Sequence, residues 1–360
     1  MFSDLTRDAA ARGDGKVLRV PGRLEFTLSG QEPALVSGLR RSIMTDVKTA
    51  AFRFDAVDPS AQDVRVLHNT GNLHNEMIGE RVGLLPLGLS KAELVDFRPA
   101  SWRFELDVEN KGKRPLDVTS ADFTVLPLDD SPALALNPAN VFRPDPLTGR
   151  HPLITVLMPG QRLALEATAS LGSGSDHARH SPACACAMHP LQDRAAVDRE
   201  RKKRDDKASF DALEAPRMLD LDGKGRPRGY RFQLESACGM SPEDIVESGL
   251  EALAGRLRAL AGSARVSEVE PQSGCAPDIH SLKLEGEDHT AAALIQSRLL
   301  DRTDFAGYYV PHLLEKSVVM RVRVPEGGGA REMLREACEE AADECEAALE
   351  AWQRFVRRKK

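Results

Sequence analysis

The segment at residues 69–87, NTGNLHNEMIGERVGLLPL, changes its pattern several times within a short space. It begins with turn residues, continues with an amphipathic stretch around Ile78, and ends in Gly83, an apolar run and Pro86. Turn formers, a helical period and a terminal proline in one short segment specify a particular local shape. Generic core packing rarely requires such a segment, so it predicts a specialised part of the fold.

The same segment resembles a signature of the platform subunits of multisubunit RNA polymerases. These are the bacterial alpha subunit, the archaeal D subunit and the third-largest subunit of eukaryotic polymerase II. Their pattern is an Asn-Thr/Ser pair, an Asn/Asp-Glu pair and an Arg-hydrophobic-Gly-Leu-hydrophobic-Pro run. The matching residues here are Asn69, Thr70, Asn75, Glu76, Arg81, Gly83, Leu84 and Pro86. The resemblance implies an α+β fold built from helices on antiparallel sheets.

Composition indicates a globular, intracellular protein. A chain of 360 residues with 41% hydrophobic content is long enough for two or three domains of roughly 100–200 residues each. No apolar run reaches the roughly 18–20 residues that span a bilayer, and residues 1–16 lack the order of a signal peptide. Six scattered cysteines favour reduced thiols. A net charge of -6 argues against a chain whose main role is phosphate binding.

A change in composition marks a β-rich insert, and the resemblance implies that the rest of the chain forms two related dimerisation units, with the insert in the first. The predicted boundaries are a flexible N-terminus at 1–15, first-unit segments at 16–50 and 225–262, the insert at 51–224, a linker at 263–277 and a second unit at 278–360. Clean alternation from Trp102 onward predicts half-buried strands in the insert. Dense mixed charge at 192–211 predicts a solvated loop, because the acids nearly cancel a basic nucleic-acid patch.

A helix is predicted from Pro33 to Asp46, since proline is tolerated in a first turn and apolar residues recur every four positions. Leu39, Arg40 and Arg41 on this helix match a Leu-Arg-Arg motif of the resembled family. The resemblance implies that the helix lies where the platform halves meet and the second-largest polymerase subunit docks. Two solvated arginines on a helix surface are the alternative interpretation.

The last part of the chain resembles the small partner subunit of the platform, which is the eleventh subunit of polymerase II and the archaeal L subunit. Its marks here are EDHT at 287–290, FAGY at 305–308 and PH at 311–312. The chain departs from that family at 291–293, where AAA replaces Leu-Gly-Asn, and at Leu313, where a second proline is usual. The resemblance therefore implies a natural fusion of both platform subunits, similar to the arrangement in large nucleocytoplasmic DNA viruses.

Two apolar seams with heptad spacing predict that the units form an intramolecular pseudo-dimer. Steps of four and three residues are typical of a helix that packs against another helix. Together with Leu39, the dimerisation seam is expected to consist of Val246, Leu250, Leu253, Leu257 and Leu260 on one helix and Leu334, Cys338, Ala341, Cys345, Ala348, Trp352 and Phe355 on the other. A coiled coil between identical chains is the competing interpretation.

One cluster combines potential metal ligands at short spacing: His177, His180, Cys184, Cys186 and His189. Such side chains bind zinc, so a metal-dependent enzyme is an alternative function. The ACACA sequence is also typical of a strand with both thiols on one face, and the usual spacing between zinc-binding cysteines is absent. Many members of the resembled family hold a metal or cluster on cysteines early in the insert, where this chain has none. We therefore expect no metal and no cofactor.

The resemblance implies a non-catalytic assembly platform of a DNA-directed RNA polymerase, acting in transcription. The implied partners are the second-largest subunit, then the largest, and a small zinc-binding subunit like the tenth subunit of polymerase II. DNA is reached only through the complex, and no membrane is involved. The expected contact residues are Arg40, Arg41, Glu76 and Arg81, the last two forming either a subunit contact or an internal ion pair. A viral source would place the protein in the virion and in the host cytoplasm or nucleus. A free-standing interaction module is a further alternative.

Overall fold

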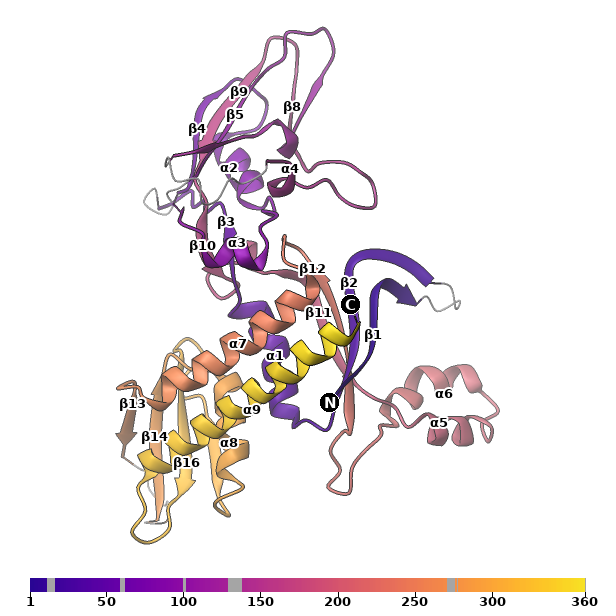
Figure 1. Cartoon of the computed structure of the whole chain (residues 1–360), viewed down its shortest axis with the longest axis vertical. Coiled ribbons are helices and arrows are strands. Elements are labelled where there is room, and N and C mark those ends of the chain that lie inside the picture. Colours follow the sequence, from indigo (N-terminus) through magenta and orange to yellow (C-terminus); the bar gives the residue numbers. More distant parts are fainter. Residues whose placement is uncertain are drawn as a thin grey trace.

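The computed structural model is an α+β fold in which helices pack on antiparallel sheets, and this confirms the predicted fold class. It describes residues 1–11, 17–58, 62–99, 102–128, 138–270, 276 and 278–359. Figure 1 shows an elongated lobe at the top, a sheet with crossing helices in the middle, and a second sheet with its helices below. Within the described ranges, no helix combines the length and the apolar character needed to cross a membrane.

The central sheet and two helices form what we call the first unit. The sheet is antiparallel with the order β1-β2-β12-β11. Its strands are β1 (Phe2–Ala11), β2 (Val17–Ser29), β11 (Ala183–Pro190) and β12 (Gly229–Ser236). Phe26 on β2 lies opposite Phe232 on β12, with ring centroids 4.9 Å apart. Helices α1 (Pro33–Thr45) and α7 (Pro242–Ala261) bury their apolar faces in the same core.

The second unit repeats this plan with the equivalent strand order, β13-β14-β16-β15, in which the fourth strand along the chain again lies between the second and the third. Its strands are β13 (Val266–Val269), β14 (Ile279–Glu285), β15 (Ala306–Tyr309) and β16 (Ser317–Arg323). Its helices are α8 (His289–Leu299) and α9 (Ala330–Lys359). The Asp288 carboxylate caps α8 by accepting a hydrogen bond from the Thr290 amide at 2.8 Å.

The insert forms the upper lobe in Figure 1. It contains a sheet with the order β4-β9-β5-β7 and the strand pairs β3–β10 and β6–β8. The strands are β3 (Lys48–Ala51), β4 (Val64–Asn69), β5 (Trp102–Glu109), β6 (Leu116–Thr119), β7 (Thr124–Pro127), β8 (Leu153–Leu157), β9 (Arg162–Ala167) and β10 (Ser170–Ser173). The helices are α2 (Asn75–Gly83), α3 (Lys91–Val95) and α4 (Pro138–Val141). Phe52 and Phe104 lie at the centre of its core, with centroids 5.0 Å apart.

Helices α7 and α9 pack side by side and antiparallel, so each unit completes the core of the other (Figure 1). The C-terminal half of α7 contributes Leu253 and Leu257 to the core of the second unit. The C-terminal half of α9 contributes Ala348 and Trp352 to the core of the first unit. Removing either helix would therefore expose apolar surface in both units.

The prediction of a flexible N-terminus at 1–15 is wrong for residues 2–11, which form β1 at the edge of the first sheet. Phe2 packs against Trp352, with ring centroids 5.0 Å apart. The strand shows no simple alternation because its register shifts twice, and Asp4 and Asp8 adopt left-handed backbone angles there. Residues 12–15 lie outside the described part of the chain.

The prediction of a loop at 192–211 is also wrong, because two short helices form there: α5 (Arg194–Arg201) and α6 (Lys207–Leu213). The Asp193 and Asp206 carboxylates cap them by accepting backbone hydrogen bonds at 2.9 and 3.0 Å. An ion pair of 2.8 Å between Arg201 and Asp211 joins the two helices. The charges that suggested a solvated loop thus act as helix caps and cross-links.

Two predicted boundaries need correction. Strand β11 falls within the predicted insert at 51–224, yet it pairs with β12 in the first sheet. Strand β13 falls within the predicted linker at 263–277 and pairs with β14. The pairing of β11 is not visible in the local pattern, because β12 follows only after α5 and α6, and β13 is too short to show a clear alternation. Residues 271–275 and 277 of that linker lie outside the described ranges.

Candidate subunit-docking site

The signature segment at 69–87 forms a turn, helix α2 and an extended stretch on the insert. The Asn69 side chain organises the turn: its Nδ2 donates to the Leu73 carbonyl at 2.8 Å and its Oδ1 accepts from the Gly71 amide at 2.9 Å. Ile78 and Val82 on one face of α2 are buried in the insert core. The opposite face, which carries Glu76, is therefore held outward in a fixed orientation.

Glycines along the segment allow close contacts that a larger side chain would prevent. A Cβ atom at Gly79 would lie 2.3 Å from the Phe54 ring, and one at Gly83 would lie 2.5 Å from the Arg179 guanidinium. At Gly88, just after the signature, a Cβ atom would lie 2.0 Å from the backbone oxygen of Asn140. The glycine spacing of the signature therefore reflects packing of α2 and the following chain against the insert.

Arg179 holds this arrangement from a buried position that the sequence did not reveal, with 3% of its side chain exposed. Its guanidinium donates to the backbone oxygens of Phe52 at 2.8 Å and Phe54 at 3.1 Å. It also lies 3.6 Å from the Glu80 carboxylate on α2 and donates to His177 Nδ1 at 3.1 Å. Arg179 therefore links α2 to the chain segment that follows β3.

We expect Gly88→Ala to destabilise the insert by about 3 kcal/mol, because the clashing atom belongs to the backbone and cannot rotate away. Gly255→Ala is the matched control, since nothing lies within 4 Å of a Cβ atom at that exposed position of α7. Alanine there should stabilise α7 by about 0.5–1 kcal/mol. Urea unfolding of the two variants measures both effects, and equal stabilities would contradict the packing argument.

The structure places the predicted contact residues Glu76 and Arg81 on the exposed side of α2. They form no ion pair with each other, so the internal-pair interpretation is wrong. Arg81 donates to the Leu153 carbonyl at 2.7 Å, whereas the Glu76 carboxylate has no partner among the described residues. Met77 and Leu84 on the same side are half or more exposed. The outer side of α2 combines free charge with exposed apolar side chains, as docking surfaces do.

The predicted contact residues Arg40 and Arg41 lie on α1, and none of the described contacts joins them to Glu76 or Arg81. Arg41 pairs with Asp288 of the second unit at 3.2 Å. Arg40 is half-buried near Cys186 and has no hydrogen bond or ion pair with any described residue. The four residues therefore define two separate patches, and Arg41 has a role between the units that sequence reasoning missed.

A partly buried charge network connects the units next to Arg41. Arg256 on α7 lies 2.8 Å from Glu287, 3.0 Å from Asp288 and 3.3 Å from Asp46. Glu287 is 2% exposed, and this burial raises its pKa in spite of Arg256. Burial acts in the same direction on Asp288, but Arg256 and the Thr290 amide outweigh it and lower the Asp288 pKa. Two acids of the EDHT segment thus hold the two units together.

The residues predicted for the seam all lie at the contact between the units or in the adjoining cores. Leu39, Val246, Leu250, Ala348 and Trp352 are buried in the core of the first unit, with Phe355 packed against it. In the core of the second unit lie Leu253, Leu257, Leu260, Leu334, Cys338, Ala341 and Cys345. Arg258 on α7 pairs with Asp343 and, at 3.0 Å, with Glu346 on α9. Burial raises the pKa of the Cys338 and Cys345 thiols to about 12, so these are inert core residues.

The potential metal ligands at 177–189 do not converge, and no group of three or more ligating side chains gathers anywhere in the described ranges. His180 is buried and its Nδ1 lies 3.2 Å from the Thr49 carbonyl oxygen. The prediction that Cys184 and Cys186 share a face is wrong, because a register shift at the start of β11 leaves Cys184 exposed while Cys186 packs inward.

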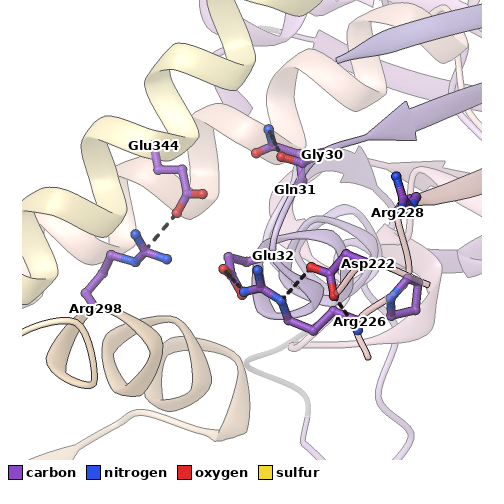
Figure 2. A pocket seen from close by; sticks show the side chains of 9 residues that line it. Gly30, Gln31, Glu32, Asp222, Arg226, Arg228, Arg298 and Glu344 are labelled. Carbon is purple, nitrogen blue, oxygen red and sulfur yellow. Dashed lines mark hydrogen bonds and ion pairs between the residues drawn. The ribbon is translucent and has the colours of Figure 1, made fainter. Parts of the chain in front are cut away.

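Figure 2 shows a pocket of about 420 Å³ where the two units meet. Arg226 pairs with Asp222 at 3.1 Å and with Glu32, which precedes α1. Across the pocket, Arg298 on α8 lies 3.9 Å from Glu344 on α9. Three acids and three arginines line it, Glu32, Asp222, Glu344, Arg226, Arg228 and Arg298, so the formal charges cancel. The pocket does not favour a cationic or an anionic ligand.

Fold and site together describe an α+β protein with two units paired through helices and two separate charged surface patches. Residues 280–351 match the family model of the RNA polymerase Rpb3/Rpb11 dimerisation domain. A DNA-directed RNA polymerase subunit Rpo3 of Natronomonas pharaonis is 26% identical over 252 residues, covering 64% of this chain and 89% of the relative. The Rpo3 of Aeropyrum pernix is 24% identical, covering 60% of this chain and 75% of the relative.

A third Rpo3, from Thermococcus kodakarensis, is 30% identical over 170 residues, which cover 45% of this chain. That alignment spans 53% of the relative, or about half of its length. The domain match and the three relatives support an alpha-like subunit of RNA polymerase.

Proposed function

We propose that this chain is a non-catalytic assembly platform of a DNA-directed RNA polymerase, in which a D-like first unit with its insert and an L-like second unit are fused. The observation that carries the proposal is the antiparallel pairing of α7 and α9, through which each unit completes the core of the other. Because the two units pair with each other within one chain, the surface patches on α1 and α2 can bind other subunits. The family match at 280–351 and the Rpo3 relatives agree with this division.

We further propose that the second-largest polymerase subunit docks first, followed by the largest, and that a small zinc-binding subunit joins them. DNA is then contacted only through the complex. The fusion favours a viral polymerase, similar to those of large nucleocytoplasmic DNA viruses, present in virions and in the host cytoplasm or nucleus. Affinity purification of the tagged chain from its native source tests this proposal. Recovery of the very large chains that carry the nucleotidyl-transfer site supports it, and recovery without them favours a free-standing interaction module.

The proposed docking residues are Arg40 and Arg41 on α1 and Glu76 and Arg81 on α2. We expect Arg40→Glu together with Arg41→Glu to reduce recovery of the second-largest subunit by about tenfold or more, because the new carboxylates would repel the acidic surface that we propose binds these arginines. Arg40→Glu alone is the sharper variant, since it leaves the pair between Arg41 and Asp288 intact. Quantitative mass spectrometry of the purified complexes measures the loss.

Two controls accompany the charge reversal. Arg150→Glu reverses an exposed arginine of the insert, far along the chain from α1, and should leave recovery unchanged. Thermal unfolding of each variant separates lost docking from lost folding. Undiminished assembly of the Arg40→Glu variant would remove Arg40 from the docking site.

A further inference from the structure

The two edges of the first sheet differ in how they are protected. At one edge, β1 contains two register shifts, and Asp4 and Asp8 adopt φ angles of 53° and 51° there. Charged residues and such irregularities prevent another strand from pairing with an edge. The edge formed by β1 is therefore closed to further strands.

The opposite edge, β11, has no register shift after its first residues, and a proline occurs only at its last residue, Pro190. After the shift between Ala183 and Ala185, its register with β12 runs regularly to Pro190. The sequence ACACAM at 183–188 contains no charged residue and no proline. A regular, uncharged edge is a template for pairing with another strand.

The hydrogen-bonding pattern identifies which backbone groups face outward. Next to the strand, the Leu191 amide donates to the Gly229 carbonyl at 2.8 Å. In antiparallel pairs the bonded residues alternate, so Ala185, Ala187 and His189 also bond to β12. The N–H and C=O groups of Cys186 and Met188 then point away from the sheet, and no described residue bonds to them.

A charged side chain lies close to this edge. Cys186 and Met188 pack their side chains against the core of the first unit, so their backbone stays in place. Arg40 lies close enough to Cys186 to lower its thiol pKa, although burial dominates and raises that pKa to about 12. Arg40 has no partner among the described residues. The open edge thus includes a residue, Cys186, that lies near a cation without a partner in the described ranges.

We propose that the free edge of β11 receives an extended strand from another polymerase subunit, with main-chain hydrogen bonds to Cys186 and Met188 and an acidic residue that meets Arg40. This inference rests on the proposed function and deepens it, since it specifies a backbone-mediated docking mode for the partner. Strand addition obtains affinity from main-chain hydrogen bonds and specificity from neighbouring side chains.

Amide hydrogen exchange at single-residue resolution tests the inference on the isolated full chain and on the assembled complex. The amides of Cys186 and Met188 should exchange rapidly in the isolated chain and become at least about tenfold slower in the complex. The amides of Ala187 and His189, which bond to β12, serve as internal controls and should be protected in both. Unchanged exchange at Cys186 and Met188 in the complex would overturn the proposal.

A pair of variants gives an independent test. Met188→Pro and Met188→Ala both remove the thioether side chain, but only proline removes the outward N–H, and proline is tolerated on strand edges. We expect Met188→Pro to recover about tenfold less of the partner than Met188→Ala, with similar thermal stability. Equal recovery, or an isolated chain that already dimerises with these amides protected, would refute the assignment. A wild-type chain that recovers no polymerase subunits would instead refute the proposed function.

Discussion

Arg256→Met is expected to lower the free energy of unfolding of the paired units by about 3–5 kcal/mol. The substitution removes the cation nearest to Glu287, Asp288 and Asp46, and it leaves the buried Glu287 with only the more distant Arg265, at 3.9 Å. The flexible apolar side chain of methionine keeps most of the packing volume, so the loss reports the charge network. This contact joins α1 and α7 to the start of α8, so the loss should appear as weaker coupling between the units.

Urea unfolding followed by tryptophan fluorescence measures this effect, because the two tryptophans report on different regions. Trp352 lies in the core shared by the units and Trp102 in the insert core. A Trp102→Phe background isolates the signal of Trp352. Adding Glu287→Gln to Arg256→Met removes the carboxylate that has lost its nearest cation and should recover part of the stability. If Arg256→Met lowers the free energy of unfolding by less than about 1 kcal/mol, then water solvates the Glu287 carboxylate in place of Arg256.

Trp352→Ala is expected to cost about 3–5 kcal/mol, the range for truncating a buried aromatic side chain. Trp352 is fully buried, and its ring centroid lies 4.8 Å from that of Phe26 and 5.0 Å from that of Phe2. Its Nε1 donates to the Glu243 carbonyl at the start of α7, at 3.1 Å. One side chain of α9 therefore holds β1, β2 and α7 together.

Exchange of the β1 amides with deuterium measures the local consequence. In Trp352→Ala these amides should exchange much faster than in the wild type, because Phe2 loses its main contact. Trp352→Phe is the matched control: it keeps a six-membered aromatic ring but loses the five-membered ring and its N–H hydrogen bond, and it should cost about 1–2 kcal/mol, less than Trp352→Ala. If β1 keeps its protection in Trp352→Ala, then Trp352 does not anchor the N-terminal strand.

Helices with a regular spacing of apolar residues could be predicted from the sequence alone. The steps of four and three in α7 and α9 depend only on local spacing, so they identify helices that need partners. Capping residues such as Ser241 and Asp288 act on neighbouring residues, and the side chain of each accepts a backbone hydrogen bond at the start of a helix. Local rules predict local elements, and they also indicate which face of each helix is apolar.

Contacts between residues far apart in the sequence could not be predicted in this way. Arg41 and Asp288 are separated by 247 positions, and nothing in the Leu-Arg-Arg motif indicates that one of its cations is used within the chain. Arg179 lies between two histidines, where the sequence draws attention to metal ligands instead of the arginine. The place of β11 could be predicted only from knowledge of the sheet to which the chain returns. In each case the missing information was the partner, which only the tertiary fold supplies.

The covalent connection between α7 and β13 has a consequence for how the protein is made. Two separate chains must find each other at their cellular concentrations, and an excess of either stays unpaired. A tether of this length instead gives the halves an effective concentration of around millimolar. Their stoichiometry is then fixed at translation and is insensitive to dilution, so regulation acts on one gene product instead of on a balance between two.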